Sequence, residues 1–190
     1  EKTLSLLKKI LMISIPVTIS SVISVIHPLI DSATVSRCIQ TAFASLYPVK
    51  EQLETLAMSK TGIISKIDTL TNLPIAVNIA FSTALVPAIS AAIAKKDFTN
   101  VSKRMTFSIF ASLLIVLPCA AGFISLAQPI LNLIYPAAND GATLLMLYSV
   151  AMVFIALNQT INGGLYGINK MTVPLISLVV AAVLKIILNN

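Results

Sequence analysis

The sequence predicts an all-α fold, a polytopic transmembrane helix bundle of about five spans, and three observations support this. Of the 190 residues, 57% are hydrophobic and only 11% are charged, whereas a soluble domain is about half apolar and about a quarter charged. The mean hydropathy of +0.95 means more apolar surface than a water-soluble globule can bury. The apolar residues form continuous runs that suit membrane helices of about 20 residues, without the period-two alternation of a membrane β-barrel.

The uncharged runs define the expected spans in chain order. Each run is bounded by Lys, Arg, Asp or Glu, and Pro129 and Pro136 divide the longest run, 105–139, into a span and a short interfacial segment. We therefore expect a single transmembrane region over 1–190, with spans at about 10–31, 69–94, 105–127, 143–167 and 172–190, the last incomplete. The chain starts without Met and stops within an apolar segment, so we expect a piece of a longer membrane protein.

The segment 36–68 is expected to be an outer loop that contains an amphipathic helix. Its apolar residues fall roughly at helical spacing, while Glu51, Glu54 and Lys60 lie mostly off that face, a pattern typical of a helix on a membrane surface. The apolar residues are Val49, Leu53, Leu56, Ile63 and Ile67. An ordinary connector that packs on the bundle explains the same pattern equally well.

The basic residues predict the orientation of the chain. Eight lie on the side where the chain begins and four on the side of the 36–68 loop, where acidic residues lower the net positive charge. The eight are Lys2, Lys8, Lys9, Lys95, Lys96, Lys103, Arg104 and Lys170, and the four are Arg37, Lys50, Lys60 and Lys66. Because basic loops stay in the cytoplasm, the start of the first span is expected to be cytoplasmic.

The first span carries a polar stripe. Ser20, Ser24, His27 and Asp31 follow one another at spacings of four, three and four residues, so they share one face of a helix. Polar residues in a membrane helix usually face the bundle or a hydrated cavity. The stripe therefore predicts a cavity wall, with Asp31 near the outer mouth. The alternative is helix–helix hydrogen bonding by the serines, with Asp31 at the interface.

The fourth span carries three amides, Asn158, Gln159 and Asn162, followed by three glycines. Such amides are costly in lipid unless they find partners. They can line a substrate cavity, or they can join helices while Gly163, Gly164 and Gly167 allow close packing. The sequence leaves both interpretations open and slightly favours the second.

Lys185 is the single most informative residue. It follows Lys170 by about 22 Å at 1.5 Å per helical residue, well inside a hydrocarbon core of about 30 Å. A lysine at that depth costs on the order of 3 kcal/mol on insertion scales. We therefore expect Lys185 to face a hydrated cavity, the alternative being an anchor at the outer interface.

Several functions are excluded or disfavoured. The single histidine gives no metal-binding cluster, no pair of carboxylates shares a span, and there is no phosphate-binding GxxxxGK[ST] motif, so we expect no enzyme activity and no cofactor. The net charge is +6, but the chain has no Trp and no basic-aromatic platform, which argues against nucleic acid as a partner. The two cysteines, Cys38 and Cys119, do not form a disulfide scaffold.

Several stretches resemble the stage V sporulation protein B and MurJ-type lipid flippases, within the superfamily that also contains the MATE-like exporters. The most specific is Leu85-Val86-Pro87-Ala88-Ile89-Ser90, which follows Asn72-Leu73-Pro74-Ile75-Ala76 and precedes Lys95-Lys96-Asp97. Further matches are Ile15-Pro16-Val17, Leu29-Ile30-Asp31, Asn158-Gln159 with Gly163-Gly164-Leu165-Tyr166-Gly167, and Lys185-Ile186-Ile187-Leu188-Asn189. The resemblance implies a fragment of the second lobe of a two-lobe transporter in the bacterial plasma membrane.

The resemblance also implies a function and partners. The implied activity is flipping of a lipid-linked glycan precursor for cell wall, spore cortex or surface polysaccharide, by alternating access of two lobes. The partners would be that lipid, the bilayer and the missing first lobe. The family's cationic cavity residues lie mainly in that first lobe, so Lys185, Arg37 and Asp31 are candidates from this sequence alone. The alternatives are a cation-coupled drug exporter, which needs buried carboxylates, and a membrane scaffold without transport.

Overall fold

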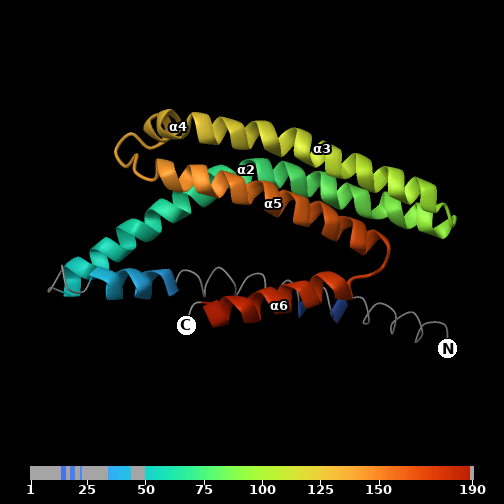
Figure 1. Ribbon diagram of the computed structural model, residues 1–190, viewed down its shortest axis with the longest axis horizontal. Helices are drawn as coiled ribbons and strands as arrows, with labels where there is room; N and C mark the ends of the chain where they lie inside the picture. The colour runs from blue at the N-terminus through green and yellow to red at the C-terminus, as the bar shows by residue number, and fades with distance from the viewer. Residues whose placement is uncertain (1–13, 16–17, 20–21, 23–33, 44–49, 189–190) are drawn as a thin grey trace. The chain divides into compact units, whose positions relative to one another are not determined.

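The computed structural model describes residues 14–15, 18–19, 22, 34–43 and 50–188. All regular structure in this part of the chain is α-helical, which confirms the predicted all-α fold. Residues 34–43 are helical. The helices that follow are α2 (Lys50–Ala94), α3 (Phe98–Ser125), α4 (Ala127–Ile134), α5 (Ala142–Gly167) and α6 (Thr172–Leu188) (Figure 1).

Three of the described helices are long and apolar enough to cross a membrane. These segments are Glu51–Ala94, Phe98–Ser125 and Ala142–Gly167, and a shorter apolar helix covers Thr172–Leu184. Their length and composition confirm a multi-pass membrane helix protein. The predicted first span lies mostly outside the described residues, so the number and limits of the spans stay predictions.

The chain forms two compact units. One contains residues 59–169, and the other contains residues 1–58 together with 170–190. The first unit holds most of α2 and all of α3, α4 and α5, while the second holds the helix over 34–43, the first residues of α2, and α6. The packing, the polar cluster and the groove described below all belong to the unit of residues 59–169.

The turns between helices contain residues with positive φ. Lys96 has φ 58° in the tight turn after α2, and Asp97 then caps α3 by accepting a hydrogen bond of 2.9 Å from the Asn100 amide. An acidic N-cap satisfies one of the unpaired N–H groups of a helix's first turn. Gly141 has φ 110° at the start of α5, a left-handed conformation that favours glycine.

The longest apolar run, 105–139, is divided at the break between α3 and α4. The helix α3 ends at Ser125, and α4 starts at Ala127, so Pro129 is the third residue of α4. Proline is tolerated in the first turn of a helix, because the N–H it lacks has no partner there. Figure 1 shows α4 at the end of the unit opposite the turn between α2 and α3.

Two apolar clusters fill the interior of this unit. The first lies beside α4 and consists of Ile67, Leu70, Ala127, Leu131 and Leu145. The second joins α2, α3 and α5 and consists of Ile75, Val116, Ala120, Met152 and Ala156. All of these residues are buried, and they fix α3 and α5 side by side with α2 (Figure 1).

The loop between α4 and α5 is attached to α2. The ammonium group of Lys66 donates a hydrogen bond of 2.8 Å to the Ala138 carbonyl and lies 5.6 Å from the centre of the Tyr135 ring. A lysine at that distance from an aromatic face gains a cation–π attraction. Lys66 therefore holds this loop on the side of α2.

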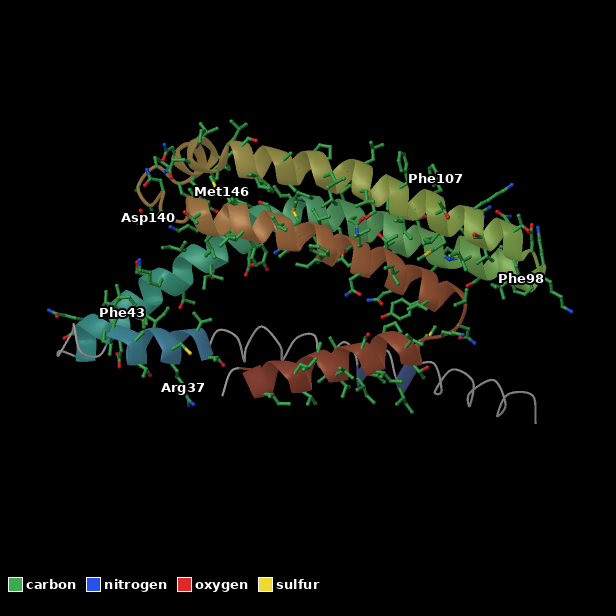
Figure 2. All side chains as sticks on the ribbon, in the orientation of Figure 1. Arg37, Phe43, Phe98, Phe107, Asp140 and Met146 are labelled. Carbon is green, nitrogen blue, oxygen red and sulfur yellow. The ribbon has the colours of Figure 1, made fainter. Side chains whose placement is uncertain are left out.

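The outer face of α3 is apolar and exposed. Phe107, Phe110, Leu114 and Leu117 are each between 50% and 69% exposed, and Figure 2 shows Phe107 on the side of α3 away from α2 and α5. The opposite face of α3 carries the buried residues Ser112, Val116 and Ala120. So large an exposed apolar face suits lipid as the solvent.

Candidate functional site

A buried polar cluster lies where α2, α3 and α5 meet. Asn78 from α2, Ser112 from α3 and Thr160 from α5 are at most 1% exposed. A polar group at such a position costs free energy unless it is hydrogen-bonded. Among the described residues, every buried side-chain nitrogen or oxygen has a partner.

Asn78 is the centre of this cluster. Its amide nitrogen donates to the Ala156 carbonyl at 2.9 Å and to the Gln159 side-chain oxygen at 3.2 Å. Its amide oxygen accepts a hydrogen bond from the Ser112 hydroxyl and lies 3.5 Å from the Thr160 hydroxyl. The Thr160 and Ser112 hydroxyls are themselves 3.2 Å apart. One amide therefore links three helices and fixes the orientation of the Gln159 side chain.

Asn78 and Ser82 were not identified from the sequence, although a signal was present. Both lie on the buried stripe of α2, with Leu85 and Ile89 following at the next helical spacings. The amide of Asn78 thus occupies a position where an uncharged span normally carries an apolar residue. Its spacing indicates a buried polar group, but the identity of its partners depends on which helices pack there.

The glycines of α5 bring its backbone close to α2. A Cβ atom at Gly163 would lie 2.7 Å from the Ser82 carbonyl oxygen, and one at Gly167 would lie 2.7 Å from the Ile89 Cβ. Real Cβ atoms essentially never come so close to other atoms, so only glycine fits at either position. Small residues of this kind are typical of closely packed membrane helices.

Two serines of α2 use this close approach to reach the backbone of α5. The Ser82 hydroxyl donates to the Gln159 carbonyl at 2.6 Å, and the Ser90 hydroxyl donates to the Gly167 carbonyl at 2.9 Å. The two bonds are about two helical turns apart along α2. They hold the two helices in a fixed register along the second half of α5.

Beside this contact, a groove of about 220 Å³ opens between α2 and α5. It combines apolar walls with hydroxyl and amide groups. It is lined by Ile79, Ser82, Thr83, Val86, Gln159, Asn162, Gly163 and Tyr166. None of these lining residues is charged, so the groove offers hydrogen bonds without a net charge.

Pro87 leaves one backbone carbonyl of α2 without its normal helical donor. Proline has no N–H group, so the carbonyl of the residue four positions earlier does not receive its normal helical hydrogen bond. That residue is Thr83, which lines the groove. The Thr83 hydroxyl lies 2.9 Å from the Ile79 carbonyl and 3.0 Å from the Ala80 carbonyl, and its oxygen can still accept a hydrogen bond.

The three amides named from the sequence lie in different surroundings. Gln159 accepts a hydrogen bond from Asn78 and also lines the groove, so it joins helices and faces the groove at once. Asn162 lines the groove. Asn158 is exposed, does not line the groove, and lies 3.5 Å from the Asn162 amide nitrogen.

The remaining candidates belong to the other unit of the chain. Arg37 is exposed on the helix over 34–43 (Figure 2), and Lys185 lies in α6. Ser20, Ser24, His27 and Asp31 lie outside the described residues. Their predicted roles therefore stay predictions.

The chain is similar to known membrane proteins. A family model described as lipid II flippase MurJ matches residues 3–190. An uncharacterized membrane protein, YabM, from Bacillus subtilis (strain 168) is 25% identical over 188 residues, which is 99% of this chain and 34% of that protein. The lipid II flippase MurJ of the same organism is 26% identical over 125 residues, which is 63% of this chain and 23% of that protein.

These matches cover only part of each relative. The aligned region spans about a third of YabM and less than a quarter of the flippase. No solved structure matches the chain.

Proposed function

The chain belongs to the lipid II flippase MurJ family, and from this premise we propose that it forms part of a transporter of a lipid-linked glycan precursor. The precursor would serve cell wall, spore cortex or surface polysaccharide, and the transporter would lie in the bacterial plasma membrane. The rest of the relatives' length, which this chain does not cover, would supply the other lobe. The unit of residues 59–169 would then be a structural part of one lobe.

The observation that carries this proposal is the polar groove between two apolar helices. Polar side chains within membrane helices are rare and usually face a bundle interior or a hydrated cavity. Here Gln159, Asn162 and Thr83 open into the groove, while the outer face of α3 is apolar. This contrast supports a hydrated path on the α2–α5 side and lipid on the other.

The packing of the unit supports movement as one body. Alternating access in such transporters is largely rigid-body rocking of one repeat against another. The Asn78 cluster and the serine bonds of Ser82 and Ser90 join α2, α3 and α5 along much of their length. We infer that these three helices keep their mutual register during transport.

Lys185 is our candidate for binding the anionic part of the lipid. It lies about 20 Å along α6 from Thr172, at 1.5 Å per residue, a depth at which a charge needs a hydrated or anionic environment. A lysine donates charge-assisted hydrogen bonds to phosphate oxygens. The polar stripe of Ser20, Ser24, His27 and Asp31, together with Arg37, supplies our further candidates for contacts with the lipid.

Replacing Lys185 tests this function in the intact protein. The Lys185→Met change keeps the length of the side chain and removes its charge. We expect flipping of the lipid to slow by about 10- to 100-fold, the effect of losing one charge-assisted contact to the substrate. The measurement is rescue of growth in a bacterium depleted of its own lipid II flippase, with the amount of membrane-inserted protein determined in parallel.

Lys170→Met is the matched control. Lys170 lies in the exposed turn before α6, where its charge is needed only for orientation, so this variant should rescue growth like the unchanged protein. Full rescue by Lys185→Met at normal protein levels would contradict the proposed role of Lys185.

The proposed orientation has a separate test. The distribution of basic residues, eight against four, supports a cytoplasmic turn between α2 and α3. In intact cells, a membrane-impermeant thiol reagent should label Lys60→Cys and leave Lys96→Cys unlabelled, in a background without Cys38 and Cys119. Labelling of Lys96→Cys alone would show that the chain has the opposite orientation.

A further inference from the structure

The groove between α2 and α5 has the chemistry of a site for an uncharged sugar. We propose that it binds one N-acylated or polyhydroxylated sugar ring of the transported lipid, apart from the diphosphate. This inference rests on the proposed function, because it assumes that a lipid-linked glycan reaches the groove.

The first argument is the charge of the lining. The polar groups are the amides of Gln159 and Asn162, the hydroxyls of Ser82 and Thr83, and the phenol of Tyr166. A diphosphate needs cationic partners, and the groove contains none. Sugar hydroxyl and acetamido groups are neutral donors and acceptors, which match amides and hydroxyls.

The second argument is that the buried cluster leaves one donor of a lining residue unused. The Gln159 side-chain oxygen accepts a hydrogen bond from Asn78 at 3.2 Å. This contact occupies the oxygen of a residue that lines the groove and leaves its amide nitrogen with two donor hydrogens. Within the described part of the chain this nitrogen has no protein partner. It can donate to a carbonyl oxygen, such as that of an acetamido group.

The third argument is that the lining residues also supply acceptors. The Thr83 carbonyl lacks its helical donor because of Pro87, and the Thr83 hydroxyl oxygen retains free lone pairs after donating to Ile79. The Asn162 nitrogen lies 3.5 Å from the Asn158 oxygen, which leaves the Asn162 oxygen to accept. Sugar hydroxyls would donate to these oxygens.

The fourth argument is size and shape. The groove holds about 220 Å³, which is less than the roughly 300–1,000 Å³ of sites for drug-sized ligands. It therefore has room for a single ring. Ile79, Val86 and the ring of Tyr166 give apolar walls, which match the C–H faces of a pyranose.

The test compares two lipids with the purified intact protein in lipid nanodiscs. One is a polyprenyl diphosphate without sugar, and the other is the same lipid carrying one N-acetylhexosamine. The unchanged protein should bind the sugar-bearing lipid about tenfold more tightly. Asn162→Leu should reduce this preference to about one and Tyr166→Phe should reduce it about threefold, as expected for lost hydrogen bonds, while the Kd for the sugar-free lipid stays unchanged.

Tyr148→Phe is the matched control, since Tyr148 is the other tyrosine of α5 and does not line the groove. It should keep the full preference for the sugar. If the unchanged protein binds neither lipid, the proposed function fails and the inference fails with it. The unchanged protein could bind the lipids while Asn162→Leu and Tyr166→Phe keep the preference for the sugar or weaken the binding of both lipids equally. In that case the groove is not a sugar site, while the proposed function stands.

Discussion

Gly163→Ala should lower the free energy of unfolding of the intact protein by about 3 kcal/mol, the upper end of the range for overpacking a closely packed interior. The added Cβ would contact the Ser82 hydroxyl and lie 2.7 Å from the Ser82 carbonyl oxygen. The carbonyl belongs to the backbone of α2, so relief requires α2 and α5 to separate. Separation would also stretch the 2.6 Å bond from Ser82 to the Gln159 carbonyl. The measurement is thermal or denaturant unfolding of the purified protein in detergent.

Gly122→Ala is the control for this prediction. Gly122 lies inside α3, and a Cβ there would meet no atom within 4 Å. Alanine is favoured over glycine in a helix by about 1 kcal/mol, so this variant should be as stable as the unchanged protein or slightly more stable. Equal stability of the two alanine variants would show that α5 does not approach α2 as closely as described.

Asn78→Leu should lower the free energy of unfolding by about 2 kcal/mol. Leucine has a similar volume but leaves the Ser112 hydroxyl, the Gln159 side chain and the Ala156 carbonyl without the bonds that Asn78 makes. Leaving buried polar groups unpaired costs about 1–3 kcal/mol. The loss should appear in the same unfolding measurement and as a lower amount of protein in the membrane.

Two further variants test whether the loss of stability comes from the hydrogen bonds of Asn78. Asn72→Leu changes an exposed amide of the same helix and should alter the stability by less than about 0.5 kcal/mol. The pair Asn78→Leu and Ser112→Ala should be non-additive, because each removes the same hydrogen bond. Additive losses would contradict a direct link between these two side chains.

The sequence alone determined the fold class of this protein. Transfer into a bilayer depends on the composition and length of each apolar run, which are properties of the chain itself. Long uncharged runs such as 69–94 and 143–167 therefore predicted membrane helices before any packing was known. The resemblance carried by Leu85-Val86-Pro87-Ala88-Ile89-Ser90 pointed to the same flippase family as the comparisons.

The sequence also predicted part of the candidate site. Amides within an uncharged span stand out by their cost in lipid, so Gln159 and Asn162 were identified from the sequence, although cavity lining and helix joining could not be separated. Thr83 and Tyr166 were not identified, because single hydroxyl residues are common in membrane helices and give no comparable signal.

Only the tertiary structure decided which residues meet. Helical spacing shows which face of α2 carries Asn78, but its partners Ser112 and Thr160 lie 34 and 82 residues away along the chain. Which helices pack, and in what register, depends on the shapes of all their faces together. The same packing gives Gln159 both of its roles, since its side-chain oxygen meets Asn78 and the residue also lines the groove. Periodicity in a sequence specifies a buried face, and the neighbour on that face follows from the contacts between helices.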